Sequence, residues 1–338
     1  MKEKRILLSH GSGGTMTRDL INHCFVRQFD NPLLNLLDDQ AIFPAPSSRL
    51  AFTTDSYVID PIFFPGGDIG RLAVCGTVND LAVSGATPLY LSCSLIIEEG
   101  FLMSDLEKIL RSMHETCREA GVLIVTGDTK VVNCGAMDKI FINTAGVGAL
   151  EDGLSISGHN ARVGDKVLVS GFLGDHEVAI ISKRENLGFI TQVHSDLAPM
   201  NGLVSTLLKK GFGRHLHTMR DPTRGGLATV LNEIAEQSQV GIIIDEDKVP
   251  IREEVRGACE ILGFDPLYLA NEGKLVIFIQ AEKAQEALSV IRGTPYGRHA
   301  QIIGDVIAEP KSRVQLRTAI GGTRILDMLA TEQFPRIC

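Results

Sequence analysis

The chain has 338 residues, a net charge of −8 and 44% apolar residues. This length predicts two domains with enough apolar surface for a core in each, which excludes a disordered protein. An acidic chain with 5% aromatic residues lacks the positive field and the stacking rings that nucleic-acid binding usually needs. No apolar run approaches the roughly 20 residues that span a bilayer, and the first run is too short for a signal peptide. We expect a cytoplasmic protein that binds neither nucleic acid nor a membrane.

Short apolar runs typical of strands alternate with helical patterns in the N-terminal half. The predicted strands are residues 50–54, 89–97, 122–126 and 140–148, and the predicted helices are 68–84 and 104–120. Ser104 is the candidate N-cap of the second helix, and Gly121 its candidate stop. Residues 151–165 carry three glycines and no apolar period, so we interpret them as a linker that follows an N-terminal domain of residues 1–150.

The same alternation predicts a second domain over residues 166–310, so the fold class is α/β or α+β. The predicted strands are 166–170, 240–245, 274–280 and 301–306, and the predicted helices are 175–183, 196–210, 225–237 and 282–292. Gly321, Gly322 and Pro335 interrupt any regular pattern beyond this point. We expect residues 311–338 to form a flexible tail, which in extended form reaches on the order of 55 Å from Gly321.

Seven cysteines are scattered through the chain without the spacing of a zinc site or a disulfide framework, which indicates reduced thiols. Cys338 differs from the others because it is the last residue. A thiol at the end of a flexible arm can accept a group at one site and present it at another. We favour this function over an accidental terminal cysteine.

Aspartates recur at the ends of predicted elements in the N-terminal half. Mg²⁺ is commonly held by one or two carboxylates together with substrate phosphates, so the set favours a nucleotide–metal site. Each aspartate taken alone is more simply explained as a turn residue. The set consists of Asp38, Asp39, Asp55, Asp80 and Asp128, and Asn79 adds a neutral oxygen. The candidate metal ligands among them are Asp39, Asp55, Asp80 and Asp128.

A glycine-rich turn near the N-terminus is a candidate phosphate site. Backbone N–H groups of His10, Gly11, Gly13 and Gly14 can approach phosphates closely, although a flexible turn explains the same residues equally well. The chain contains no P-loop motif, so an ATP site here is of another kind.

Four charged residues complete the set of candidates. Arg224 precedes a Gly-Gly helix start that suits an anion. Glu272 and Lys274 lie at the mouth of a predicted strand, where a proton-transfer group is useful, and Lys130 follows Asp128 by two residues. Solvated turns and surface charges explain the same residues.

Several motifs together resemble the HypE family of hydrogenase maturation proteins, the carbamoyl dehydratases. The motifs are HGSGG (10–14), TTDS (53–56), FFPGGDIGRLAVCGTVNDLA (63–82), IIEEGF (96–101), TGDTKVV (126–132), DPTRGGLA (221–228), NEGK (271–274) and PRIC (335–338). The resemblance covers essentially the whole chain. It implies a PurM-like fold, as in aminoimidazole ribonucleotide synthetase, with an N-terminal domain that forms a β-barrel across a homodimer and a C-terminal α/β domain.

The resemblance also implies a reaction, with ATP and Mg²⁺ as cofactors. A HypF-type carbamoyltransferase loads a carbamoyl group onto Cys338, and ATP-dependent dehydration converts the group to a thiocyanate. The cyanide then passes to iron on a HypC–HypD-type complex. The implied proton acceptor is Glu272, with Lys130 as its electrostatic partner.

Two other functions stay open. A small-molecule kinase or synthetase of the same superfamily, such as selenophosphate synthetase or thiamine-phosphate kinase, would share the aspartates, but the terminal PRIC argues against it. A non-catalytic carrier in metallocentre assembly would need the tail but not Asp80, Asp128 or Glu272, and their joint presence favours an enzyme.

Overall fold

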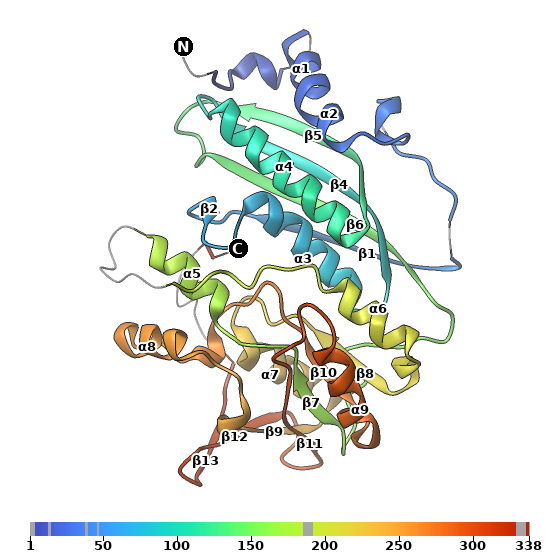
Figure 1. Ribbon diagram of the computed structural model, residues 1–338, viewed down its shortest axis with the longest axis vertical. Helices are drawn as coiled ribbons and strands as arrows, with labels where there is room; N and C mark the ends of the chain where they lie inside the picture. The colour runs from blue at the N-terminus through green and yellow to red at the C-terminus, as the bar shows by residue number, and fades with distance from the viewer. Residues whose placement is uncertain are drawn as a thin grey trace.

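The computed structural model describes residues 4–12, 15–37, 40–45, 47–184, 192–328 and 336–337. Two α/β domains are stacked one above the other (Figure 1). The N-terminal domain is built on a four-stranded sheet of order β1-β6-β4-β5, in which only β4 and β5 run parallel. Its strands are β1 (Arg49–Tyr57), β4 (Thr87–Glu98), β5 (Leu123–Val132) and β6 (Ile140–Leu150).

Two helices, α3 (Ile69–Val83) and α4 (Met103–Ala120), cover one face of this sheet (Figure 1). Asp68 caps α3, because its carboxylate accepts the N–H groups of Gly70 and Arg71. The prediction of Ser104 as the N-cap of α4 is wrong, since the helix begins one residue earlier and Leu102 occupies that position. Gly121 ends α4 in the left-handed conformation, with φ of 72°, as predicted.

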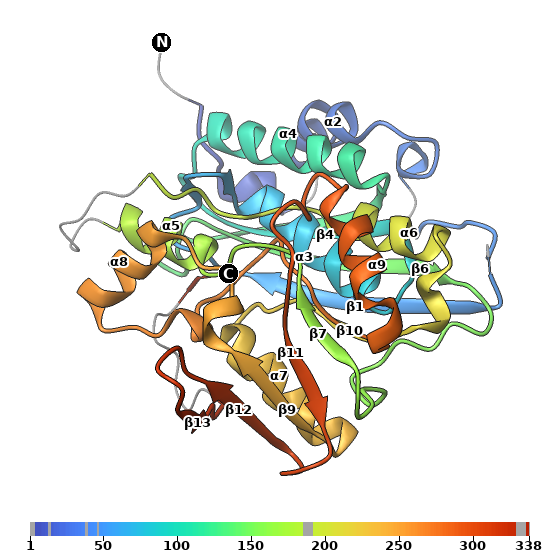
Figure 2. The ribbon, with the colours of Figure 1, turned by 60° about the horizontal axis from the view of Figure 1, so that its bottom comes forward.

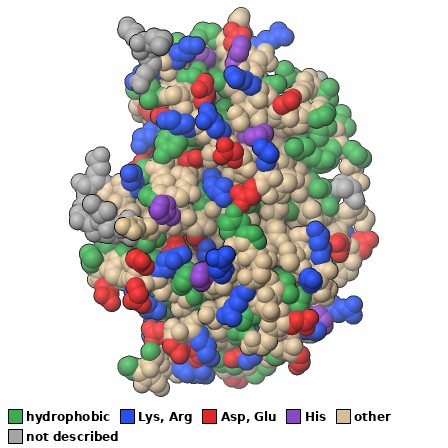
Figure 3. All heavy atoms as spheres, in the orientation of Figure 1, with side chains coloured by type: hydrophobic (Ala, Val, Ile, Leu, Met, Phe, Trp, Pro, Cys, Tyr) green, Lys and Arg blue, Asp and Glu red, His purple; other side chains and the backbone are tan. Residues whose placement is uncertain are grey.

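Among the described residues, no helix covers the other face of the sheet (Figure 1). Side chains alternate across a strand, so every second residue points to this open face. Several large apolar side chains are exposed at these strands, including Phe52 at 71%, Leu50 at 49% and Ile96 at 43%. Figure 3 views the opposite, helix-covered side, where hydrophobic side chains gather at the upper right of the N-terminal domain and charges of both signs are interspersed over the rest of the face shown.

The C-terminal domain contains a seven-stranded mixed sheet of order β13-β12-β9-β11-β7-β10-β8. Helix α7 packs on one face, and α6 and α9 pack on the other (Figure 2). The strands are β7 (Lys166–Val169), β8 (Leu216–Arg220), β9 (Gly241–Asp245), β10 (Val276–Ile279), β11 (Gln301–Ile307), β12 (Arg313–Arg317) and β13 (Thr323–Ile325). The helices are α5 (Asp175–Lys183), α6 (Asn201–Lys209), α7 (Gly226–Ser238), α8 (Glu253–Leu262) and α9 (Ala281–Arg292).

Two further segments belong to the N-terminal domain. The short helices α1 (Thr15–Leu20), η2 (Ile21–Val26) and α2 (Arg27–Phe29) lie beside β5, and the hairpin of β2 (Phe63–Phe64) and β3 (Gly67–Asp68) leads into α3. Within the part of the chain that the structure describes, no helix is long and apolar enough to cross a membrane.

The prediction that the tail begins at residue 311 is wrong. Strand β12 pairs in parallel with β9, and Val314 and Leu316 are fully buried in the core of the C-terminal domain. This segment was missed because five residues beside a Gly-Gly turn carry too little periodicity to predict a strand. The far end is also anchored, since Ile337 is 5% exposed and belongs to the core cluster of the N-terminal domain.

Candidate active site

Acidic side chains from both domains approach one another where α3 meets the C-terminal domain. Asp80 on α3 accepts a hydrogen bond of 2.9 Å from Thr53 Oγ1 on β1. Asp80 and Asp55 both raise the pKa of Asp221, which follows β8, and that of Glu272, which precedes β10. We call this group of Asp55, Asp80, Asp221 and Glu272 the acidic chamber.

Burial and mutual repulsion raise the pKa values of three members of the acidic chamber, Asp80, Asp221 and Glu272. Burial first, and then the charge of Asp80, raises the pKa of Asp221 to about 7. Burial and the charge of Asp221 hold the pKa of Glu272 well above its usual range. Glu272 is 2% exposed, and its Oε1 lacks a hydrogen-bond partner among the described residues. The acidic chamber is therefore suited to a proton acceptor and to a bound cation.

The acidic chamber does not by itself form a complete metal site. Among the described residues, no three His, Cys, Asp or Glu side chains lie close enough together to hold a metal ion. Its oxygen donors and the raised pKa values of Asp80, Asp221 and Glu272 still fit a hard divalent cation, because such a cation favours the ionised carboxylates. Phosphate oxygens supply the remaining ligands in many Mg²⁺ sites.

Asp128 does not join Asp55 and Asp80 within one chain, contrary to the predicted set of ligands. In the strand register, Asp55 shares a row with Thr144 and Cys93, which are buried under the helices, whereas Asp128 shares a row with Ser94 on the open face. The edge strands β1 and β5 are three spacings apart, or about 14 Å. The period of two along each strand, together with this strand order, separates the two carboxylates.

Lys130 is not the partner of Glu272 in the described structure. Its ammonium forms an ion pair of 3.0 Å with Asp128 on the open face of the sheet, where both side chains are more than half exposed. The predicted pairing of Lys130 with Glu272 within one chain is therefore wrong, because β5 faces away from the acidic chamber.

Lys274 is linked to Glu272 through Asp196. Its Nζ lies 3.0 Å from Asp196 Oδ2 and donates to the carbonyl of Gly273. The other carboxylate oxygen of Asp196 accepts the backbone N–H of Glu272 at 3.0 Å. One buried carboxylate thus holds both members of the Glu272/Lys274 pair. The sequence placed both residues at a strand mouth, but Asp196 is too distant in the chain for any local pattern to reveal it.

Asn79 joins the two domains, which differs from its predicted role as a nucleotide ligand. The residue is buried, and its side-chain amide donates to the carbonyls of Ala198 and Glu272 at 3.1 and 3.2 Å. Its Oδ1 accepts the N–H of Met200 at 2.7 Å. These three bonds fix the loop before α6 and the backbone of Glu272 against α3.

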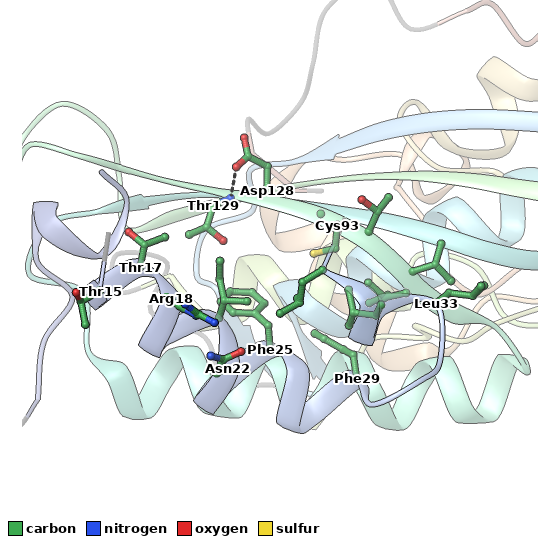
Figure 4. Close-up of a pocket in the computed structure, with 17 residues that line it drawn as sticks. Thr15, Thr17, Arg18, Asn22, Phe25, Phe29, Leu33, Cys93, Asp128 and Thr129 are labelled. Atoms are coloured by element: carbon green, nitrogen blue, oxygen red, sulfur yellow. Dashed lines mark hydrogen bonds between the residues drawn. The ribbon is translucent and has the colours of Figure 1, made fainter. Parts of the chain in front are cut away.

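A cavity of about 1110 Å³ lies between the N-terminal helices and β5 (Figure 4). Phe25, Phe29 and Leu33 give it an apolar wall, and Arg18 and Asn22 give it polar groups at one end (Figure 4). Asp128 stands at its rim and points away from the helices (Figure 4). The size and mixed lining suit a small-molecule ligand.

The remaining predicted residues fall into three groups. His10 accepts the N–H of Leu7 in a short turn, and a Cβ on Gly11 would lie 2.4 Å from the backbone nitrogen of Val131, so this turn packs closely on β5. Arg224 is exposed before α7. Asp39, Gly13, Gly14 and Cys338 lie outside the described residues.

The last described residues are held at the boundary between the domains. The carbonyl of Arg336 accepts from the N–H of Asp60 and from the guanidinium of Arg184. The Arg336 guanidinium donates to the carbonyl of Val58 and forms an ion pair of 2.7 Å with Asp138. These contacts dock Arg336 and Ile337 on the N-terminal domain.

Comparisons with known proteins agree with this architecture. The model of the AIR synthase related protein N-terminal domain matches residues 37–150, and that of the C-terminal domain matches residues 162–317. The class is therefore that of AIR synthase related proteins, with their two α/β domains, and the predicted fold class is confirmed.

Relatives at high identity cover the whole chain. Carbamoyl dehydratase HypE of Rhizobium leguminosarum bv. viciae is 54% identical, over 99% of this chain and 95% of the relative. Carbamoyl dehydratase HypE of Escherichia coli K12 is 47% identical, over 98% and 99%. The chain belongs to the HypE family of carbamoyl dehydratases, which confirms the resemblance seen in the sequence.

Solved structures give the same result. A hydrogenase maturation protein HypE in complex with ATP superimposes with a TM-score of 0.94 at 52% identity, over 98% of this chain and 99% of that one. HypE in a HypE–HypF complex gives 0.80 at 48% identity, over 92% and 99%. Thiamine monophosphate kinase from Aquifex aeolicus, at 21% identity, a TM-score of 0.61 and coverage of 94% and 99%, shows the shared fold alone.

Proposed function

We propose that this chain is an ATP-dependent carbamoyl dehydratase that converts an S-carbamoyl group on Cys338 to a thiocyanate for the iron centre of [NiFe]-hydrogenase. The observation that carries the proposal is the docked end of the tail, where the Ile337 carbonyl lies 2.9 Å from His176 Nε2. The segment that holds this ring through Ser195 also holds the backbone of the buried Glu272 through Asp196. A carrier without catalytic function needs no such proton acceptor. A small-molecule kinase needs no docked terminus.

The cavity beside β5 is the proposed site of the adenine nucleotide. Its apolar wall suits a purine ring, and Arg18 suits a negatively charged group. Thr15 and Leu37 line the cavity, and in the sequence they are adjacent to the predicted phosphate motif and to the predicted metal ligand pair Asp38–Asp39. A relative of 52% identity binds ATP, which supports a nucleotide site in this chain.

The proposed metal is Mg²⁺, held by Asp55 and Asp80 together with nucleotide phosphates, while Asp39 and Asp128 are proposed as further ligands. When bound, Mg²⁺ neutralises charge on the phosphoryl group that is transferred. A hydrogen bond from Thr53 positions Asp80. Burial raises the pKa of Asp80, so its ionised form is unfavourable until a cation binds.

The reaction needs one proton acceptor at the carbamoyl nitrogen. In the first step the carbamoyl oxygen takes the γ-phosphoryl group, ADP leaves, and the nitrogen loses one proton. In the second step the nitrogen loses its other proton, the C–O bond breaks and phosphate leaves as the C≡N bond forms. We assign the nitrogen protons to Glu272, whose Oε1 is buried and available. Lys274, held by the same Asp196 carboxylate that accepts the N–H of Glu272, takes in this proposal the role expected of Lys130.

The proposed assembly is a homodimer that meets a HypF-type carbamoyltransferase and a HypC–HypD-type complex. Within one chain the cavity at β5 and the acidic chamber beside β1 lie at opposite edges of the sheet. Packing of two open sheet faces would bring the cavity of one copy toward the acidic chamber of the other. The solved HypE–HypF complex supports the first partner.

A charge on the open face should break this dimer. Phe52→Asp places a carboxylate where a side chain is 71% exposed in the single chain, so it should leave the fold intact. We expect light scattering to report a monomer, and dehydration to be lost with the dimer. Phe52→Leu is the matched control and should stay dimeric. A monomeric Phe52→Asp protein with full activity would contradict a shared site.

Mass spectrometry of the C-terminal peptide tests the proposed function directly. Carbamoylated protein supplied with Mg-ATP should lose one water from this peptide and release one phosphate. Cys338→Ala should take up no carbamoyl group at all. ATP consumption without a change in the mass of the peptide would favour a small-molecule kinase, and an unchanged mass without ATP consumption would favour a carrier.

A further inference from the structure

A buried histidine contacts the backbone of the docked tail. His176 on α5 is fully buried, and its ring packs edge-on against Phe64 with centroids 5.7 Å apart. Its Nε2 lies 2.9 Å from the carbonyl oxygen of Ile337, which is one peptide bond before Cys338. A carbonyl only accepts hydrogen bonds, so Nε2 carries a proton.

Ser195 contacts the other nitrogen of the His176 ring. Its hydroxyl lies 2.7 Å from His176 Nδ1 and accepts the backbone N–H of Leu197 at 3.2 Å. Burial lowers the pKa of His176, which favours the neutral ring. In a neutral ring with the proton on Nε2, Nδ1 accepts, so the Ser195 hydroxyl donates to it. The two contacts therefore select one tautomer.

The same loop holds the proposed proton acceptor. Asp196, the next residue, accepts the backbone N–H of Glu272 at 3.0 Å and pairs with Lys274. Two consecutive residues thus link the ring that binds the tail to the backbone of Glu272. This loop is also tied to the N-terminal domain, because Ser195 donates its N–H to the carbonyl of Pro65.

We propose that His176 is a positioning residue for the dehydration. Its Nε2–H binds the Ile337 carbonyl, so that the group carried by the next residue is presented to Glu272 in one fixed position. Ser195 fixes the tautomer that makes this bond. The inference rests on the proposed function, because it concerns where the docked tail presents the group to be dehydrated. The contact itself can be tested without the reaction.

Trypsin gives a readout of the contact that is independent of catalysis. Cleavage after Arg336 releases the dipeptide of residues 337 and 338, and docking protects this bond because the Arg336 side chain is held by Val58 and Asp138. In the full chain, His176→Phe should cleave about 3- to 10-fold faster, the size expected for loss of one hydrogen bond. His176→Gln keeps a donor near the Nε2 position and should restore protection.

Two further variants complete the set. Ser195→Ala leaves the ring in place but releases the tautomer, so it should also cleave faster than the native chain. His159→Phe replaces an exposed histidine and should cleave at the native rate. Single-turnover dehydration of carbamoylated protein should fall in the same order, with His176→Phe slowest and His176→Gln near native.

The outcomes separate the two proposals. Fast cleavage of His176→Phe and Ser195→Ala in a protein that dehydrates nothing supports the tail contact and overturns the proposed function. Native cleavage and native dehydration in both variants overturn the role of His176. Equal loss in His176→Phe and His176→Gln overturns it as well, because the ring would then act by shape and not by donating a hydrogen bond. If His176→Phe does not fold, Ser195→Ala decides the question.

Discussion

Glu272→Gln is expected to abolish dehydration while leaving carbamoyl loading and ATP binding intact. Removal of a positioned general base typically slows a reaction by about 10² to 10⁴-fold. Gln keeps the shape of the side chain and the backbone bond to Asp196, so the change isolates the carboxylate. The measurement is single-turnover mass spectrometry of the C-terminal peptide, with calorimetry for ATP. Native turnover in the variant would exclude Glu272 as the proton acceptor.

The pH dependence gives this prediction a second test. Burial, then the charges of Asp221 and Asp196, raise the pKa of Glu272, so the native rate should increase with pH as the carboxyl ionises. The free energy of unfolding should change in the opposite direction and decrease with pH. Above the unfolded pKa of 4.5 the folded state holds the proton more tightly, so the free energy of unfolding falls as pH rises toward the folded pKa.

Glu272→Gln removes this cost of ionisation. Metal-free Glu272→Gln should therefore match the native chain in thermal unfolding at pH 5 and exceed it at pH 8. Asp128→Asn is a suitable control for stability, because this carboxylate is exposed and should show little difference between the two pH values. A lower unfolding temperature for Glu272→Gln at pH 8 would contradict the electrostatic description of the acidic chamber.

Lys274→Met should lower both stability and dehydration. The side chains of Lys274 and Asp196 are 11% and 1% exposed, so the variant leaves a buried carboxylate without its cation. Breaking a buried ion pair on one side costs about 3–5 kcal/mol. Lys130→Met breaks an exposed pair and should cost at most about 1 kcal/mol. Urea unfolding compares the two variants.

The double variant Asp196→Asn/Lys274→Met separates folding from catalysis. Replacing both members of a buried ion pair by neutral groups is often close to neutral for stability, and Asn still accepts the N–H of Glu272. We expect stability to return while dehydration stays slow. Recovery of both would show that Lys274 acts only on the fold, and would return the choice of catalytic cation to Lys130 across the dimer.

Local periodicity was enough to predict most of the elements. The helix over 68–84 and the strands over 89–97 and 140–148 appear within a few residues of their expected bounds, because each carries its own apolar pattern. Strand β8 and helix α8 were missed. The apolar residues of β8 are interrupted by His217 and Thr218, which are buried with polar partners that lie far away in the chain.

The candidate site was harder to predict, because its geometry depends on strand order and domain packing. Asp55 and Asp128 look equivalent as strand-borne aspartates, yet the register puts them on opposite faces. Glu272 was predicted from its position before a strand, and the structure adds burial and the link to Asp196. His176 carries no local signal, since its function depends on a residue 161 positions away.

The docking of Ile337 in the N-terminal core has a consequence for any partner that modifies the last residue. Burial of an isoleucine side chain stabilises a folded protein by about 1.5–3 kcal/mol, so the undocked tail is a minor population of about one part in ten to one in a hundred. A partner that captures the free terminus binds more weakly by the same factor. The N-terminal core and the modifying partner therefore compete for the same C-terminal segment.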